Sequence, residues 1–159
     1  MKDLLIDSET AMSIIRGCLV VTLQGELYDD TLMKIRADIL QKIQAAKIRG
    51  MILDLSTVRA LDSLAFNFLA DTARMASLLG VANVFVGLQP GVVSSLVDLE
   101  VEIDGIRAAL TMEDGFEQVQ NVLSIQGGVQ DAEDSDSIII ENDEGESGGE
   151  EGTGRPGEI

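Results

Sequence analysis

The stretch MILDLSTVRALDSLAFNFLADTARMASLLG, residues 51–80, changes along its length from a strand pattern to a helix pattern. Its first five residues are almost entirely apolar, which is typical of a short strand buried on both faces of a sheet. After a polar loop, Asp62 and Ser63 begin a helical spacing that reaches Leu79 and is closed by the glycine that follows. The stretch therefore predicts the strand–helix unit from which α/β folds are built.

The predicted helix is unusually apolar. Between Leu64 and Leu79, 11 of 16 residues are apolar, and the polar Asn67, Asp71 and Arg74 fall on one narrow stripe. An amphipathic surface helix normally has a wider polar face. This helix is therefore expected either to be wedged inside the domain or to have its exposed side covered by another subunit.

Two strands and a helix are expected upstream. Residues 13–24 are mostly apolar and β-branched, and an Arg-Gly pair divides them into two short strands or a hairpin-like pair. Asp29 or Asp30 can then cap a helix that ends near Gly50. The apolar side of this helix is Leu32, Ile35, Ile39 and Ile43.

Downstream, residues 84–86 predict a buried strand, and residues 89–91 (Gln-Pro-Gly) open a third helix, because proline suits the first helical turn. A last edge strand is expected within residues 101–106. Thr111 and Asp114 resemble a capping box at the start of a fourth helix. The expected inner faces are Val93, Leu96 and Val97 in the third helix, and Met112, Phe116, Val119 and Leu123 in the fourth. This order predicts a single α/β domain, in which about four helices flank a mixed central sheet.

The charge of the chain limits its partners. The 159 residues include 28 acids and 11 bases, a net charge of −17, so nucleic acid and anionic membrane surfaces are not expected to bind. The sequence has no histidine and one cysteine, Cys18, which excludes histidine-dependent triads, zinc clusters and a disulfide within the chain. No secretory signal or membrane-length apolar run is visible, so a cytoplasmic location is expected.

Most of the charge lies at the C-terminal end. Residues 126–159 carry 11 acids and one base, a net charge of −10, and eight of the 16 glycines, whereas residues 1–125 have a net charge of −7. Without an aromatic residue, this segment cannot bury enough apolar area to offset the entropy of ordering, so we expect a disordered acidic tail after a domain of residues 1–125. Ile138–Ile140 interrupts it, either as a strand-adding motif or as a stray apolar patch.

The segment DLSTVRALDS, residues 54–63, resembles the signature of STAS domains, the family of anti-sigma-factor antagonists. Together with four further stretches it is similar to the RsbS-type scaffold of the bacterial stressosome, over about 110 residues. The further stretches are CLVV at 18–21, QGELYDDT at 24–31, GLQPGV at 87–92 and AALTMEDGFE at 108–117. The resemblance implies a mixed sheet flanked by helices.

Two departures from the wider family favour the stressosome class. Ser63 is followed by Leu-Ala-Phe, not by a small residue and glycine, and no long sensor domain precedes the STAS part. The resemblance implies a non-enzymatic scaffold that sequesters a serine/threonine switch kinase (RsbT type) until Ser63 is phosphorylated. It also implies homologous STAS sensor proteins (RsbR type) as partners, a phosphatase, and assembly into homo- and hetero-oligomers.

Physical chemistry supports a switch at Ser63 independently of the resemblance. A hydroxyl beside Asp62 at a helix start can stay accessible, and a helix N-terminus tolerates the charge of about −1.5 to −2 that a phosphate adds. The alternative is that Ser63 or Asp62 is only a helix cap. Ser56 and Thr57 are minor phosphorylation candidates, and Asp54 with Asp62 is expected to support the switch region.

The sequence also raises three other functions. The chain could be a free antagonist that binds an anti-sigma factor, or an enzyme or small-ligand-binding α/β domain that uses Asp54, Asp62 and Ser63 as a pocket. A phospho-accepting receiver domain is excluded, because residues 25–27 (Gly-Glu-Leu) offer no acidic pair and no lysine follows Lys47. The isolated glycines form no phosphate-binding loop, so no catalytic residues, cofactor or metal are expected.

Overall fold

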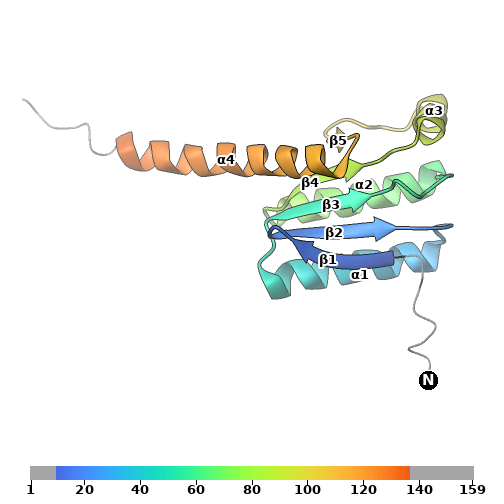
Figure 1. Ribbon diagram of the computed structural model, residues 1–159, viewed down its shortest axis with the longest axis horizontal. Coiled ribbons are helices and arrows are strands. Elements are labelled where there is room, and N and C mark those ends of the chain that lie inside the picture. The colour runs from blue at the N-terminus through green and yellow to red at the C-terminus, as the bar shows by residue number, and fades with distance from the viewer. Residues whose placement is uncertain (1–9, 137–159) are drawn as a thin grey trace, which may run out of the picture.

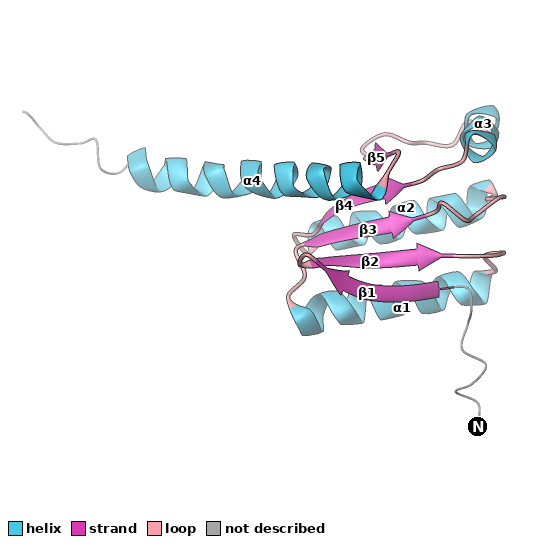
Figure 2. Cartoon of the chain, viewed as in Figure 1, coloured by secondary structure: helices cyan, strands magenta, loops and turns pink. Residues whose placement is uncertain are grey.

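The computed structural model describes residues 10–136, and the side chains of residues 10–127. A five-stranded sheet in the order β1-β2-β3-β4-β5 is flanked by four helices (Figures 1 and 2). β1 is antiparallel to β2, and the remaining neighbours are parallel. The elements are β1 (Thr10–Ile15), β2 (Cys18–Leu23), α1 (Asp29–Ala46), β3 (Gly50–Asp54), α2 (Ser63–Leu78), β4 (Ala82–Val86), α3 (Pro90–Asp98), β5 (Ala108–Ala109) and α4 (Met112–Asp136). The predicted α/β class with a mixed sheet is confirmed.

The sequence left open two short strands or a hairpin-like pair at the start of the domain, and the structure shows a hairpin. Arg16 and Gly17 join β1 to β2, and both have positive φ angles, 53° and 76°. A two-residue turn with two positive φ angles matches the right-handed twist of the strands that it joins. The turn sets the register, in which Ile15 faces Cys18.

Each face of the sheet has its own apolar core. α1, α2 and α3 pack with the larger core on one face, and α4 crosses the other face over β3 and β4 (Figure 1). The predicted inner face of α4 is confirmed, since Phe116 and Val119 are buried against the sheet and Met112 and Leu123 pack beside them. Alternate residues along β2, β3 and β4 supply the two cores, as the period of a strand requires.

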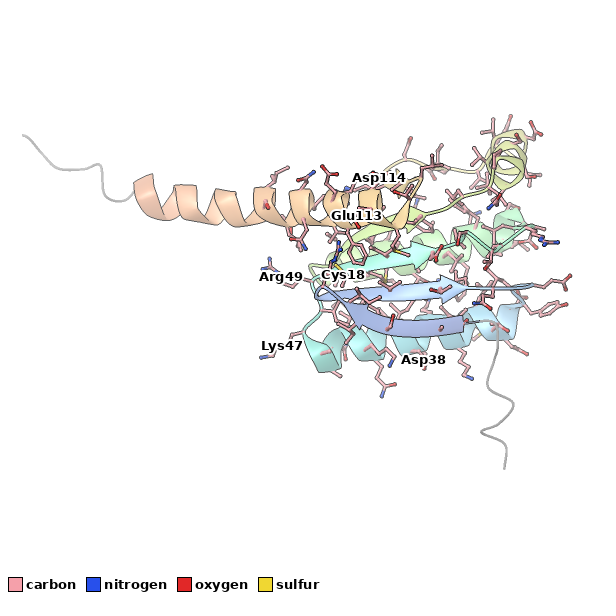
Figure 3. The ribbon with its side chains drawn as sticks, in the orientation of Figure 1. Cys18, Asp38, Lys47, Arg49, Glu113 and Asp114 are labelled. Carbon is pink, nitrogen blue, oxygen red and sulfur yellow. The ribbon has the colours of Figure 1, made fainter. Side chains whose placement is uncertain are left out.

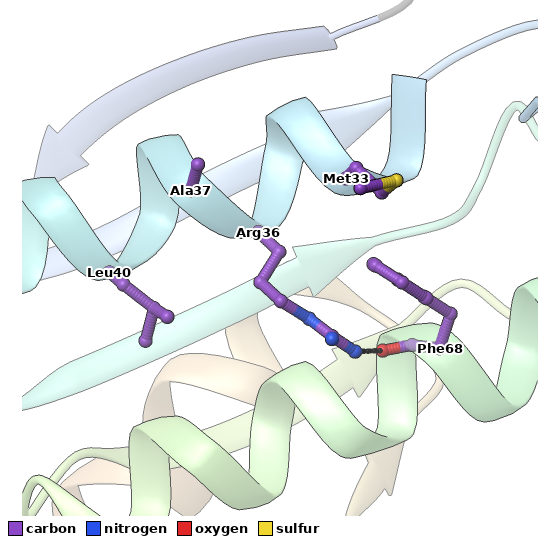
Figure 4. Close-up of a pocket in the computed structure, with 5 residues that line it drawn as sticks. All are labelled: Met33, Arg36, Ala37, Leu40 and Phe68. Atoms are coloured by element: carbon purple, nitrogen blue, oxygen red, sulfur yellow. Dashed lines mark hydrogen bonds between the residues drawn. The ribbon is translucent and has the colours of Figure 1, made fainter. Parts of the chain in front are cut away.

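The structure favours the wedged position for most of α2. Its buried side packs on the sheet, and its flank meets α1 through Arg36, whose guanidinium lies 3.6 Å from the Phe68 ring centroid and donates to the Thr72 hydroxyl at 2.9 Å. A groove of about 360 Å³ between the two helices is lined by Met33, Arg36, Ala37, Leu40 and Phe68 (Figure 4). The most exposed large apolar side chains of α2 lie at its two ends, Leu64 at 75% and Leu78 at 88%, and Met75 is also exposed.

Two helix boundaries differ from the predictions. Asp29 and Asp30 lie in the first turn of α1, where their charges complement the helix dipole, and Tyr28 holds the N-cap position without a side-chain cap bond. The helix ends at Ala46, and Gly50 already belongs to β3. Sequence patterns rarely locate helix ends to better than a residue or two, because the backbone geometry at the cap decides them.

The region after β4 also corrects two predictions. In α3 the buried pair is Val92 and Leu96, while Val93 and Val97 are largely exposed, because this helix is apolar on several sides and periodicity alone cannot select the inner one. The last edge strand is β5, not residues 101–106, which connect α3 to β5 without strand pairing.

α4 extends beyond the predicted domain boundary at residue 125. The helix continues to Asp136, eleven residues into the segment that we expected to lack structure, and projects past the sheet (Figure 2). Adding turns to a helix that is already nucleated and anchored costs little, because each residue gains a local hydrogen bond without tertiary burial. Residues 137–159, with Ile138–Ile140, lie outside the described residues.

No helix within residues 10–136 is both long enough and apolar enough to cross a membrane.

Glycines in α4 provide a test of how it docks. A Cβ atom on Gly115 would lie 2.6 Å from Cγ2 of Val86, whereas one on Gly127 would have no neighbour within 4 Å. We expect Gly115→Ala to lower the free energy of unfolding by about 1–3 kcal/mol through overpacking. Gly127→Ala, the matched control in the same helix, should not destabilise the domain, since alanine favours the helix by up to about 1 kcal/mol. Urea unfolding measures both, and equal effects would contradict this docking.

Candidate functional site

Three loops meet at the carboxyl end of the sheet, where β2, β3 and β4 end. The loop after β3, residues 55–62, is tied to both of its neighbours: the Thr57 hydroxyl donates to the Leu23 carbonyl at 3.0 Å, and the Gln89 amide donates to the Ser56 carbonyl at 2.8 Å. Carboxyl ends of parallel strands lie at one edge, so these segments become neighbours although they are far apart in sequence.

The first part of this loop has a structural role. The Ser56 N–H donates to Asp54 Oδ1 at 2.9 Å, which closes a tight turn directly after β3. Gly87 packs against the same turn, so closely that a Cβ atom on it would lie 2.7 Å from the Ser56 Cβ. Its φ angle of +75° also favours glycine. The Thr57 hydroxyl is already engaged in its hydrogen bond to β2. Ser56 is exposed, but its backbone is held on both sides.

The second part of the loop presents Ser63 at the first position of α2. Asp62 is the N-cap, with an extended backbone at φ −80° and ψ 169°, and its Oδ1 accepts from the Ala65 N–H at 2.7 Å. Ser63 is half-buried, and its hydroxyl forms no hydrogen bond to any residue that the structure describes. Of the two cap candidates, Asp62 is therefore the cap, and the Ser63 hydroxyl stays available.

The surroundings of Ser63 suit a protein contact that a phosphate could alter. The first N–H groups of a helix have no intrahelical acceptor, and with the helix dipole they favour an anion at this position. Leu64, the next residue, points a large apolar side chain into solvent, while Leu61 and Ala65 on either side are buried and hold the helix start in place. The site therefore combines a hydroxyl without a hydrogen-bond partner among the described residues, a helix N-terminus that favours an anion, and the exposed side chain of Leu64.

The lone thiol lies away from this site. Cys18 begins β2, at the end of the sheet near Lys47 and Arg49 (Figure 3). Ser63 begins α2, after the carboxyl end of β3, and so lies toward the opposite end of the sheet. Cys18 is buried, and desolvation raises the pKa of its thiol. Across residues 10–127, no group of three or more acidic, histidine or cysteine side chains is placed to hold a metal ion.

The sequence grouped five residues, and the structure places Asp54 at the end of β3, Ser56, Thr57 and Asp62 in the loop that follows, and Ser63 at the start of α2. It did not anticipate the tie from Gln89, nor the close contact of Gly87 with the same loop. The only signal was the position of both residues directly after a predicted strand. A hydrogen bond that spans 33 positions leaves no periodicity in a sequence.

Comparisons with known proteins agree with this arrangement. A model of the STAS domain family matches residues 9–114. A search of curated protein sequences found no significant match. Among solved structures, a serine-to-glutamate variant of RsbS from Moorella thermoacetica is similar at 23% identity, with a TM-score of 0.64, covering 74% of this chain and 99% of that chain.

Two further structures share the fold. One describes the molecular architecture of the stressosome, with 24% identity, a TM-score of 0.62, and coverage of 71% of this chain and 98% of that chain. The other is the anti-sigma factor antagonist SpoIIAA in its unphosphorylated form, with 18% identity, a TM-score of 0.57, and coverage of 70% and 96%. At these identities the likeness concerns the fold.

Separate roles for Asp62 and Ser63 predict separate stability effects. Asp62→Ala should lower the free energy of unfolding by about 1 kcal/mol, because it removes the cap of α2. Ser63→Ala should change it by less than about 0.5 kcal/mol, because no hydrogen bond is lost. Urea unfolding of both variants, with Asp62→Ser as a control that keeps a capping oxygen, checks this. A loss at Ser63 as large as that at Asp62 would show that Ser63 shares the cap.

Proposed function

Because the chain belongs to the STAS domain family, we propose that it is a non-enzymatic scaffold and phosphorylation switch of the stressosome type. In this role it holds a serine/threonine switch kinase and releases it when Ser63 is phosphorylated. The observation that carries the proposal is the division of labour at the start of α2, where Asp62 caps the helix and the Ser63 hydroxyl is free.

Phosphorylation at this position would change the surface and preserve the fold. The kinase would transfer the terminal phosphoryl group of ATP to Ser63 Oγ, ADP would leave, and the hydroxyl proton would pass to solvent. The new charge of about −1.5 to −2 would sit beside Asp62 and the exposed Leu64, where it would weaken an apolar contact and repel an acidic partner face. The first N–H groups of α2 would stabilise it, so the helix would not unravel.

The structural neighbours support this proposal from two directions. RsbS and the stressosome share this fold over almost their whole chains, which favours a scaffold that assembles with homologous proteins. Structures of SpoIIAA are known in the unphosphorylated and the phosphorylated form. A protein of this fold can therefore carry a phosphoryl group and keep its fold. The partners that we propose are STAS sensor proteins of the RsbR type, a switch kinase of the RsbT type and a phosphatase, in the cytoplasm.

The likeness to SpoIIAA also favours a second candidate. In that role the chain would act as a free antagonist, binding an anti-sigma factor through the same surface around Ser63 and Leu64. Both candidates use phosphorylation as the switch, and they differ in whether the protein works inside an assembly.

Phosphate mapping tests the site. Incubation with the cognate kinase and ATP should place phosphate on Ser63, detected by mass spectrometry, and should release kinase from a preformed complex. Ser63→Ala should abolish both, whereas Ser56→Ala, the matched control in the same loop, should leave both unchanged. Abundant phosphate elsewhere with none on Ser63 would refute the assignment.

Assembly tests the role. Mixed with its STAS sensor paralogue, the protein should elute from a size-exclusion column in a large complex, which electron microscopy would show as discrete particles. A chain that stays monomeric beside the paralogue yet binds an anti-sigma factor would instead be a free antagonist. Phosphate mapping in the same mixture separates a failure of assembly from a failure of the switch.

A further inference from the structure

The groove between α1 and α2 takes no part in the switch at Ser63. It has a volume of about 360 Å³ and is lined by Met33, Arg36, Ala37, Leu40 and Phe68 (Figure 4). Four of these side chains are apolar, and Arg36 alone is charged. Sites for small molecules have volumes of roughly 300–1,000 Å³ and combine apolar walls with a few polar groups. The groove therefore has the size and the composition of a site for a small ligand.

Arg36 joins the two helices with only part of its guanidinium. Its Nε donates to the Thr72 hydroxyl at 2.9 Å, and its Nη2 donates to the Phe68 carbonyl at 3.1 Å. A guanidinium carries five N–H groups, so three of them, including both on Nη1, have no partner among the described residues. The contact between the helices thus leaves donors that a ligand can use.

The positive charge of Arg36 is also uncompensated. Acids outnumber bases by 28 to 11 in the chain, yet Arg36 forms no ion pair with any residue whose side chain the structure describes. Its two hydrogen-bond acceptors, a hydroxyl and a carbonyl, are uncharged. The one acid of α2, Asp71, pairs with Arg74 at 2.9 Å. The free N–H groups and the charge of Arg36 therefore favour an anion.

We propose that this groove binds a small amphipathic carboxylate, of the class of medium-chain fatty acids. The carboxylate accepts hydrogen bonds from the free N–H groups of Arg36, because the donor fork of a guanidinium matches two carboxylate oxygens. In Figure 4 the guanidinium lies between Leu40 on one side and Met33 and Phe68 on the other, so an aliphatic chain beside it covers apolar walls.

Charge selects a carboxylate as the head of the ligand. Arg36 is a single cation in a chain of net charge −17, so it balances a monoanion, whereas the rest of the chain repels a dianionic phosphate more strongly. The groove shares no residue with the loop that presents Ser63, so the proposal goes beyond the phosphorylation switch and does not rest on it.

The C-terminal segment of the chain starts far from this groove. α1 and α2 cover one face of the sheet, whereas α4 crosses the other face and projects past it to Asp136 (Figure 1). Residues beyond Asp136 therefore begin on the side of the sheet opposite to the groove, which favours a free ligand as the occupant.

Octanoate is the probe, titrated into the full chain and followed by NMR. The largest shifts should appear at the Arg36 Nε–H and at the amides of Ala37, Leu40 and Phe68. From hexanoate to octanoate, each added CH₂ should tighten binding by up to about fourfold. The gain should stop for longer chains, because the groove spans about 10 Å along α1 from Met33 to Leu40. Octanol, which lacks the charge, should bind about threefold to tenfold more weakly.

A larger side chain at Ala37 should block the groove without removing a contact. Ala37 is exposed and lines the groove, and Ala45, another exposed alanine of α1, does not line it. Ala37→Leu should weaken octanoate binding about tenfold or more, whereas Ala45→Leu, the matched control, should change it by less than about twofold. Both variants should stay folded, since leucine is nearly as favourable in a helix as alanine.

Arg36→Gln tests the head of the ligand. It should remove the preference for octanoate over octanol, a ratio that a loss of packing alone would not change. Arg74→Gln is the matched control, because it removes one positive charge from α2 outside the groove, and it should keep the preference. Circular dichroism and cooperative unfolding establish that both variants are folded, and Ala37→Leu tests the site without touching Arg36.

Four results would overturn the proposal. Octanoate could leave the signals of the groove unshifted, or Ala37→Leu could bind it as tightly as Ala45→Leu. Octanol could bind as tightly as octanoate to the wild-type chain. Shortening the chain to end at residue 136 could shift the signals of the groove in the absence of any ligand, which would identify the C-terminal segment as the occupant.

Discussion

The parallel pairing of β2, β3 and β4 is the constraint on which the rest of the domain depends. Parallel strands require crossover connections, so α1 and α2 lie over the sheet. For the same reason the carboxyl ends of all three strands lie at one end of the sheet. At that end, Thr57 and Gln89 form the hydrogen bonds that hold the loop between Asp54 and Ser63 against its neighbours. The position of the candidate site is thus a consequence of topology.

At that edge, two adjacent residues divide two tasks. The Asp62 carboxylate satisfies the Ala65 N–H, so the start of α2 is stable without help from Ser63. A hydroxyl with no structural duty can be modified at little cost to the fold, whereas modification of a capping hydroxyl would remove a hydrogen bond as it added charge. Because of this separation, the phosphorylation that we propose at Ser63 would leave the cap of α2 in place.

The sheet is closed to further strands at one lateral edge and open at the other. β5 ends one edge after two residues, while β1 has six uncharged residues and, among the described strands, pairs with β2 alone. The free edge of β1 and the Ser63 surface are carried by different elements.

Sequence alone determined the fold class, the hairpin, the strand–helix unit around Ser63 and the inner face of α4, because these follow from local periodicity and turn chemistry. It misjudged α3, where Val92 and not Val93 is buried, and the reach of α4 to Asp136. It also left open whether Asp62 or Ser63 caps α2. Only the tertiary structure decided these points and the tie from Gln89 to Ser56, since each depends on which distant backbone and side-chain atoms share the same space.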